Sequence, residues 1–344
     1  MTTAPVIDAD EMADVMLAAV DRVTDVFAQV VDHTRRIPTA PEWTVHDLAA
    51  HMAFAPGYYL GGHLGTSVFT THAAGMADVN AGNVVALRDR PLDDLVELLR
   101  SSSREFAAHV RAVGAGEPPF AFHAGSRANS VEAMGLVIGE LNVHGWDLAG
   151  AVGVGWDIPG RDVELALRGL APLLPAWLDE EASAGHTASY EIRLRGQGVH
   201  RWRFDDGVLT TDPDGPWSPD AIISAAPGPV LLVFYQRASQ WTAIARGQMF
   251  AWGRKPWLAL GLARRFQAPD PTRSGGRARR APRHLRGRGA TASCRARRRS
   301  HRACRRRRSL DGTARRPRSG SDRSRNQPRG RRTDGRRVAR ARRS

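Results

Sequence analysis

Three side chains that could bind one metal ion lie in two distant segments of the sequence. His51 ends the run WTVHDLAAH at 43–51, and Glu140 and His144 belong to the run ELNVHGWD at 140–147. On a helix, the i, i+4 spacing puts Glu140 and His144 on one face about one turn apart, where one divalent ion reaches both. With His51 from a second helix, the site would have three protein ligands and an open position, which is typical of a catalytic metal. The alternative is a buried, hydrogen-bonded trio without metal.

For other polar residues of the helical half, the sequence gives weaker evidence of a role in metal binding. His46 precedes His51 by five residues, about 140° around the same helix, so we expect it to face solvent. Asp147, nearly one turn beyond His144, could accept a hydrogen bond that orients an imidazole; a purely local contact is the alternative. The remaining histidines before residue 150 fit no ligand spacing with the three and are predicted to be surface or loop residues: His33, His63, His72, His109 and His123.

Two predicted helices bring His51 toward its partners. Apolar residues at helical spacing predict a first helix over about 9–33. Thr44 and Asp47 have the spacing of a capping box, which predicts that a second helix starts there. His51 would then lie within the first two turns of that helix.

Two further helices complete the arrangement. The run PLDD at 91–94 predicts a third helix that ends at Gly114, and a fourth is predicted over about 131–149, capped by Asn129 or Ser130. The fourth helix carries Glu140 and His144. Four helices of this kind favour an up-and-down bundle, which builds metal sites from side chains on facing helices.

The pattern changes in the second half of the chain. A fifth helix is predicted over 162–181, and from about 189 the apolar residues alternate, which indicates strands. The run DDG at 205–207 is typical of a hairpin turn. Together with the apolar stretch at 230–234, the alternation at 243–252 and a last helix over 256–266, these segments predict a small antiparallel sheet covered by helices.

Charge divides the chain into an acidic body and a basic tail. The net charge is +15 overall, but residues 271–344 contain 29 Arg and 3 Asp, and residues 1–270 contain 21 basic and 32 acidic residues. Few apolar residues occur in 269–344, so we expect disorder there. Two explanations stay open: a genuine segment that would bind polyanions such as nucleic acid, or out-of-frame translation of a GC-rich gene.

The positions of the cysteines and the hydropathy of the chain limit the chemistry that it can perform and the cell compartment in which we expect it. Both cysteines, Cys294 and Cys304, lie in the basic tail, so the acidic body has no thiol to serve as a nucleophile, a metal ligand or half of a disulfide. We find no signal peptide and no apolar run of the roughly 20 residues that cross a bilayer. We therefore expect a cytoplasmic protein without a membrane partner.

The two ligand-bearing runs together resemble a known family. The patterns WxVxDLxxH at 43–51 and ExxxHxWDL at 140–148 are similar to those of the mycothiol-dependent maleylpyruvate isomerase family. The resemblance covers about residues 5–267. It is weaker in the second half, where it depends on the run GQMFAWGRKPWLAL at 247–260 and on the apolar helix that precedes Arg237.

The resemblance implies a fold and a domain division. It implies a DinB-like four-helix metal-binding bundle over 5–155, a sterol-carrier-like α+β domain over 156–268, and a remaining tail over 269–344. The overall class is therefore α+β.

The resemblance also implies a chemistry. Zn²⁺ or another divalent metal would be held by His51, Glu140 and His144, with mycothiol as the thiol cosubstrate of an isomerase or S-transferase. Because the family is diverse in substrate, we expect an electrophilic or carboxylate small molecule. Arg237 is the candidate catalytic residue, since a guanidinium binds a carboxylate in a bidentate manner; an Arg at the surface or at the edge of the core is the alternative.

Two other functions stay open. The chain could be a non-catalytic carrier of an apolar ligand with a structural metal site, or a polyanion binder through its tail. A closed metal site beside a large apolar tunnel would favour the carrier.

Overall fold

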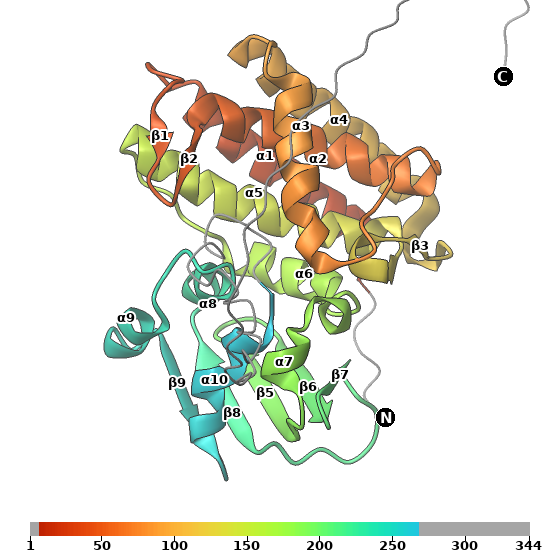
Figure 1. Ribbon diagram of the computed structural model, residues 1–344, viewed down its shortest axis with the longest axis vertical. Coiled ribbons are helices and arrows are strands. Elements are labelled where there is room, and N and C mark those ends of the chain that lie inside the picture. The colour runs from red at the N-terminus through yellow and green to blue at the C-terminus, as the bar shows by residue number, and fades with distance from the viewer. Residues whose placement is uncertain (1–6, 268–344) are drawn as a thin grey trace, which may run out of the picture. The chain divides into compact units, whose positions relative to one another are not determined.

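The computed structural model describes residues 7–267, which belong to one compact unit. Helices α1–α5 form a helical part, and α6–α10 with strands β5–β9 form a sheet part (Figure 1). This confirms the predicted α+β class, whereas the domain boundary near 155 stays a prediction. The predicted disorder of 269–344 lies outside the described residues.

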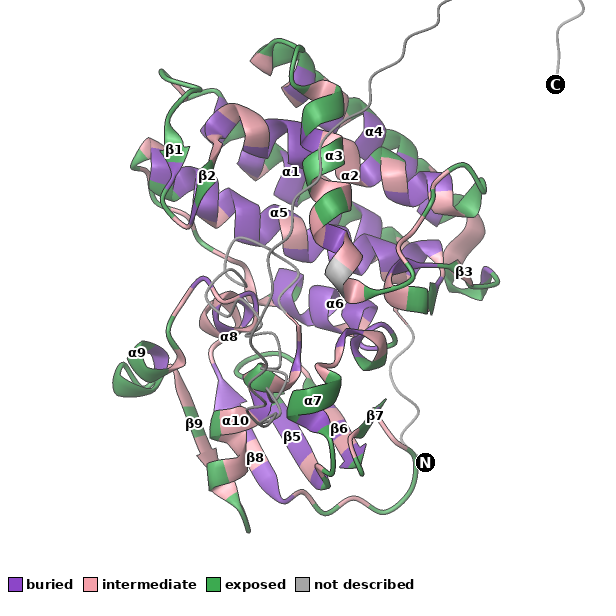
Figure 2. Cartoon of the chain, viewed as in Figure 1, coloured by how far each residue is buried: buried purple, intermediate pink, exposed green. Residues whose placement is uncertain are grey.

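Four long helices of the helical part form the expected bundle. Each of them packs against two of the others, in the cyclic order α1, α4, α2, α5. Their bounds are α1 Ala9–Phe27, α2 Val45–His63, α4 Leu92–Val113 and α5 Ser130–Val152. α5 is buried along most of its length (Figure 2), so ligands on it are shielded from bulk solvent.

The helix starts are set by their caps. Thr44 accepts from the backbone N–H of Asp47 and Asp47 returns a bond to Thr44, which confirms the capping box of α2. Asn129 and Glu132 form the same reciprocal pair at the start of α5. Both ligand-bearing helices are thus fixed in register by side chains near the predicted positions.

One helix was predicted too long and another was not predicted. The first helix ends at Phe27 and not at 33; beyond it, the Asp32 carboxylate accepts from the backbone and hydroxyl of Thr34 in a turn. α3, Met76–Leu87, was not predicted: of its side chains only those of Met76 and Val84 are buried, so it has no apolar stripe. Two short hairpins complete this part: β1 Arg36–Ile37 with β2 Ala40–Thr44, and β3 Phe120–Ala121 with β4 Arg127–Ala128.

The helix predicted over 162–181 is also broken. α6 covers Gly160–Leu170 and is followed by a 3₁₀ turn, Leu174–Trp177, and α7, Glu180–Ser183. Pro172 and Pro175 interrupt the helix because proline lacks the N–H that an interior position needs. α6 packs tightly on α5: a Cβ on Gly135 would lie 2.6 Å from the Cα of Gly169, so both glycines permit this close approach.

The sheet has five strands in the order β7-β6-β5-β8-β9. The predicted antiparallel arrangement is wrong at one pair, because β8 lies parallel to β5. After the β5-β6-β7 meander the chain returns to the far side of β5, so β8 enters in the same direction. The hairpin turn is confirmed, with positive φ at Asp206 and Gly207. The strands are β5 Ala188–Leu194, β6 Val199–Asp205, β7 Val208–Thr211, β8 Ala221–Ala225 and β9 Met249–Trp252.

Helices of the sheet part connect it to the bundle. α8 contacts both α5 and α6. The chain just after α8 carries Tyr235 and Arg237. The predicted last helix, 256–266, is instead a short α-helix between two 3₁₀ turns. The remaining helices are α8 Pro227–Phe234, α9 Gln240–Ala245 and α10 Ala259–Leu262.

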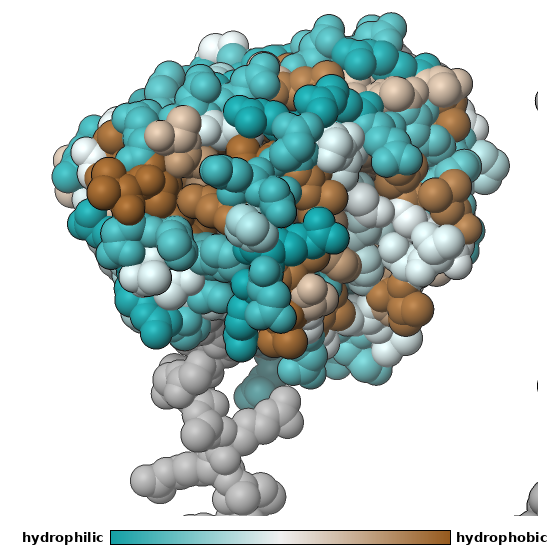
Figure 3. Space-filling model, turned by 90° about the horizontal axis from the view of Figure 1, so that it is seen from above, coloured by the Kyte–Doolittle hydropathy of each residue, from teal (hydrophilic) through white to brown (hydrophobic). Residues whose placement is uncertain are grey.

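The surface of the bundle end is largely hydrophilic, with separate apolar areas (Figure 3). Among residues 7–267, no helix combines the length and the apolar character that crossing a bilayer requires.

Candidate functional site

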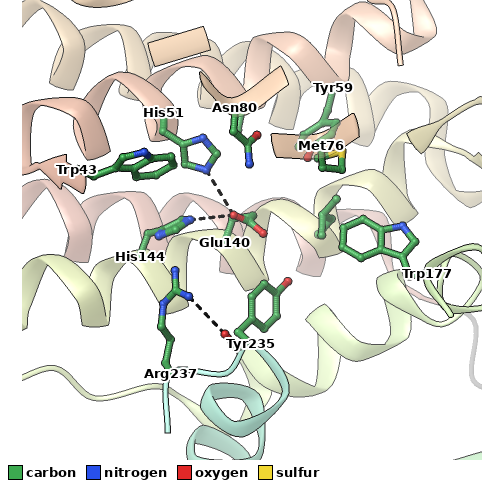
Figure 4. A pocket seen from close by; sticks show the side chains of 12 residues that line it. Trp43, His51, Tyr59, Met76, Asn80, Glu140, His144, Trp177, Tyr235 and Arg237 are labelled. Atoms are coloured by element: carbon green, nitrogen blue, oxygen red, sulfur yellow. Dashed lines mark hydrogen bonds and ion pairs between the residues drawn. The ribbon is translucent and has the colours of Figure 1, made fainter. Parts of the chain in front are cut away.

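His51, Glu140 and His144 meet inside the bundle, and we call them the inner cluster (Figure 4). The Glu140 carboxylate lies between the two imidazoles: its Oε2 is 3.1 Å from His144 Nε2 and 3.6 Å from His51 Nε2. One candidate ligand atom from each residue lies within 4.8 Å of the others. The neighbouring helices α2 and α5 therefore bring together the three residues that the sequence singled out.

Trp43 covers the two imidazoles. Its ring centroid is 5.0 Å from that of His51 and 6.2 Å from that of His144. Trp43 lies on β2, directly before the Thr44 cap of α2. The cap and the tryptophan thus restrict the imidazoles from one side.

A chain of contacts runs from His144 to the sheet part. Asp147 Oδ2 lies 3.1 Å from His144 Nδ1, and the Nε of Arg237 lies 3.0 Å from both Asp147 oxygens. Thr39, in the turn before β2, donates its hydroxyl to the same carboxylate. Of the two roles considered for Asp147, the structure favours the orienting one, because its contact with Nδ1 leaves His144 Nε2 directed at Glu140.

Burial and neighbouring charges shift the pKa values of the site residues in opposite directions. Burial alone would lower the pKa of His144, but Asp147 and Glu140 outweigh it and raise that pKa to about 9. Burial would raise the pKa of Glu140, yet the contacts with His144 and His51 hold it well below its usual value. Without a cation, the cluster is therefore an ion pair, and a bound metal would replace a proton on His144.

Two buried tyrosines stay neutral beside the cluster. Burial, and then the Glu140 carboxylate, raise the pKa of both Tyr59 and Tyr235 well above its usual value. Both line the same cavity as the inner cluster. They would therefore offer hydroxyl groups and not phenolate charges.

The cavity beside the cluster has a volume of about 40 Å³. Arg237 lines it and is 7% exposed, so it is not a surface arginine; the alternative of an arginine at the edge of the core stays open. Met76 and Asn80 of α3 and Trp177 of the 3₁₀ turn close it on other sides (Figure 4). Sequence reasoning missed these three because α3 has no apolar pattern and the turn was assigned to a long helix.

The other histidines show mixed outcomes. His46 lies outside the cluster, as predicted, with its Nε2 2.8 Å from the carbonyl oxygen of Arg90, and His33 and His72 are exposed, as predicted. His123 was predicted to be a surface or loop residue but is fully buried among Tyr58, Tyr59, Phe69 and Phe122, and burial lowers its pKa to about 4. The Phe120 and Phe122 neighbours were the sequence signal for this burial.

His63 is exposed, as predicted, whereas His109 is half-buried on α4. Their rings lie next to one another, and both approach Glu117.

A comparison with known families identifies the helical part. Residues 13–149 match the family described as the mycothiol maleylpyruvate isomerase N-terminal domain. The helical part of the chain is thus similar to the N-terminal domain of this family. The match includes His51, Glu140 and His144, and so confirms the resemblance drawn from the two sequence patterns.

Solved structures give more distant similarities. The chain is similar to a mycothiol-dependent maleylpyruvate isomerase, with 15% identity, a TM-score of 0.46, and coverage of 71% of this chain and 93% of that one. A stereoselective inverting sec-alkylsulfatase from Pseudomonas sp. has 17% identity, a TM-score of 0.27 and coverage of 61% and 34%. The UbiJ-SCP2 ubiquinone synthesis protein has 14% identity, a TM-score of 0.25 and coverage of 35% and 100%. No curated protein matches the chain.

Proposed function

We propose that this chain is a cytoplasmic, thiol-dependent isomerase or S-transferase of the maleylpyruvate isomerase type. A divalent metal, zinc in the first instance, would bind His51, Glu140 and His144, and mycothiol would be the thiol cosubstrate. The observation that carries the proposal is the convergence of these three side chains beside a cavity that Arg237 also lines. The family match over 13–149 supports it.

The donor set suits zinc. Two imidazole nitrogens and one carboxylate oxygen are ligands that zinc takes in catalytic sites, with a further position left for water or substrate. Ligands about 2.0–2.1 Å from a tetrahedral ion lie roughly 3.3 Å apart, and the inner-cluster distances of 3.1 and 3.6 Å are close to this value. Small ring rotations would therefore complete the site.

When bound, the metal would lower the pKa of a thiol at its open position, so that the thiolate could add to an electrophile or displace a leaving group from it. Residues 1–270 contain no cysteine, so we assign the thiol to a cosubstrate.

The surrounding residues have roles that follow from their contacts. Asp147 accepts from His144 Nδ1, which leaves Nε2 directed at Glu140. Arg237 places a positive charge on the wall of the cavity, where it would attract a substrate carboxylate while its Nε stays bound to Asp147. Tyr59 and Tyr235 keep their protons and could donate to an oxygen of the substrate.

The cavity must open to admit substrates. Its volume of about 40 Å³ is far below the roughly 300–1,000 Å³ of small-molecule pockets. It accommodates an ion and the sulfur end of a thiol. Entry of a whole thiol and its substrate requires displacement of covering residues such as Met76 and Asn80 on α3.

The test is a mycothiol-dependent reaction of the purified, zinc-supplemented full chain. Isomerisation of maleylpyruvate and consumption of a panel of activated alkenes and alkyl halides would be followed with and without mycothiol. We expect mycothiol-dependent turnover that Glu140→Gln abolishes and the matched control His46→Ala retains. Zinc-loaded protein that turns over none of these electrophiles with mycothiol would overturn the proposal.

An apolar-ligand carrier is the second candidate, because the sheet part contains an apolar cavity. Trp202, Phe234 and Phe266 help to line it, and its volume is about 60 Å³. This cavity is also smaller than ordinary ligand pockets, so a carrier would likewise need its cavity to open. Binding of a fluorescent fatty acid to the metal-free full chain would favour the carrier.

A further inference from the structure

A second group of two histidines and one glutamate lies at the far end of α2, and we call it the rim cluster: His63, His109 and Glu117. His63 is the last residue of α2, His109 lies in the last two turns of α4, and Glu117 follows α4. His63 is 12 residues beyond His51 on the same helix, so the two clusters are about 18 Å apart along its axis.

The three side chains converge on one carboxylate oxygen. Glu117 Oε1 contacts His63 Nδ1 and lies 3.6 Å from His109 Nε2. The imidazole centroids are 4.2 Å apart, and one candidate ligand atom from each residue lies within 4.8 Å of the others. This cluster has the same residue types as the inner cluster, two histidines beside one carboxylate, although His63 presents Nδ1 where the histidines of the inner cluster present Nε2.

The second oxygen of Glu117 holds the carboxylate in place. Glu117 Oε2 accepts from the backbone N–H of Ser130, the first residue of α5, at 2.6 Å. Ser130 Oγ lies 3.0 Å from His109 Nε2. Oε1 is therefore the oxygen presented to the two imidazoles by a side chain that is only 5% exposed.

The charge around Glu117 is not balanced by a lysine or an arginine. Within residues 7–267, the ion-pair partners of this buried carboxylate are the two histidines. The His63 side chain is 36% exposed, so the cluster is open to solvent on that side. A buried carboxylate with two imidazoles and an open side has the composition and the access that a divalent cation requires.

We propose that His63, His109 and Glu117 form a second divalent-cation site, with zinc as the fitting ion. The cation would link the end of α2, the end of α4 and, through Glu117, the start of α5. This site does not depend on the proposed enzymatic function, because none of its ligands lines the cavity of the inner cluster.

The test uses the full chain with the inner cluster disabled by His144→Ala. Into this background are placed His63→Ala or, as a matched control, His72→Ala, which removes an exposed histidine outside both clusters. Co²⁺ binding is followed by its visible absorption, and Zn²⁺ affinity is measured by competition against a chromophoric chelator. Cys294 and Cys304 are identical in all variants, so any contribution from them cancels in the comparison.

We expect His63→Ala to lose one equivalent of bound metal or to weaken metal binding by more than about tenfold. Tenfold is the lower end of the loss in affinity that disturbing a metal's outer shell causes. His72→Ala should change neither the amount of bound metal nor the affinity. Zinc should also raise the melting temperature of the His144→Ala protein but not of His63→Ala/His144→Ala. Equal binding in all three proteins would overturn the proposal. If circular dichroism shows that the His63→Ala protein is unfolded, the same metal-binding measurements are made on Glu117→Gln. This substitution keeps an acceptor for the Ser130 N–H and removes the negative charge.

Discussion

The inner and rim clusters have the same donors but different surroundings. Each has two histidines and a glutamate, and each takes one histidine from α2. The inner cluster faces a cavity with Arg237 and two neutral tyrosines, whereas Glu117 of the rim cluster is tied directly to the start of α5. Donor type alone therefore does not distinguish a reaction site from a structural one; the cavity and its polar walls do.

A third buried glutamate shows what excludes a metal. Glu164 on α6 accepts from His200 Nε2 at 3.1 Å and from the backbone N–H of Gly198 at 3.1 Å, and Arg168 donates to it from the same helix. The guanidinium supplies the positive charge beside this carboxylate. This cluster is therefore a buried salt-bridge network that fastens α6 to the sheet.

The largest effect should come from removing a ligand of the inner cluster. His144→Ala should reduce mycothiol-dependent turnover by more than the roughly 10–100-fold cost of losing an outer-shell partner. His63→Ala should leave turnover within about twofold, since the rim cluster lies about 18 Å away along α2. Steady-state kinetics on zinc-supplemented protein measures both, and a comparable loss in the two variants would break the distinction between the clusters.

A smaller effect is expected from Asp147, which orients His144 without being a proposed ligand. Asp147→Asn should weaken zinc binding at the inner cluster by about 10–100-fold and lower the free energy of unfolding by about 3–5 kcal/mol, because Arg237 loses the charge of its buried partner. Chelator competition and urea unfolding give the two values. The control is Thr39→Val, which removes a single hydrogen bond to Asp147 and should cost about 1 kcal/mol; equal effects of the two substitutions would contradict the orienting role.

The smallest effect is expected from removing the charge of Glu164, which should change the free energy of unfolding and not the turnover. Burial would raise the pKa of Glu164, but His200, Arg168 and the Gly198 N–H outweigh it and lower that pKa to about 2. The ionised carboxylate thus stabilises the fold above pH about 4.3, the value in an unfolded chain, and this stabilisation is lost as the pH falls toward 2.

The measurement is urea unfolding of the wild type and Glu164→Gln between pH 7 and pH 2. Glu164→Gln should be less stable than wild type by on the order of 3 kcal/mol at pH 7, and the difference should shrink as the pH approaches 2. Zinc should not change that difference. A difference that is independent of pH would show that the Glu164 charge does not stabilise the fold.

The inner cluster could be predicted from sequence because local rules fix most of its geometry. Glu140 and His144 are one helical turn apart, and the capping box at Thr44 sets the register of His51. The rim cluster could not be predicted in this way. Its three residues come from the ends of two helices and from a loop, so no sequence spacing relates them.

The fold shows the same division between local and long-range information. The helices α4 and α5 were predicted close to their observed bounds, and the start of α2 was predicted from its cap. The parallel pairing of β5 with β8 depends on where the chain returns after a meander, which strand patterns do not contain. The cover of the cavity by α3 was missed because few of its side chains are buried.

The central claim, that His51, Glu140 and His144 hold a metal, is tested most directly by the zinc content of the purified full chain. Elemental mass spectrometry would compare the wild type with His144→Ala and with His46→Ala, a histidine on the same helix as His51 but outside the cluster. We predict that His144→Ala contains one zinc per chain less than the wild type and that His46→Ala does not. Equal zinc content in the wild type and a folded His144→Ala protein would contradict the account.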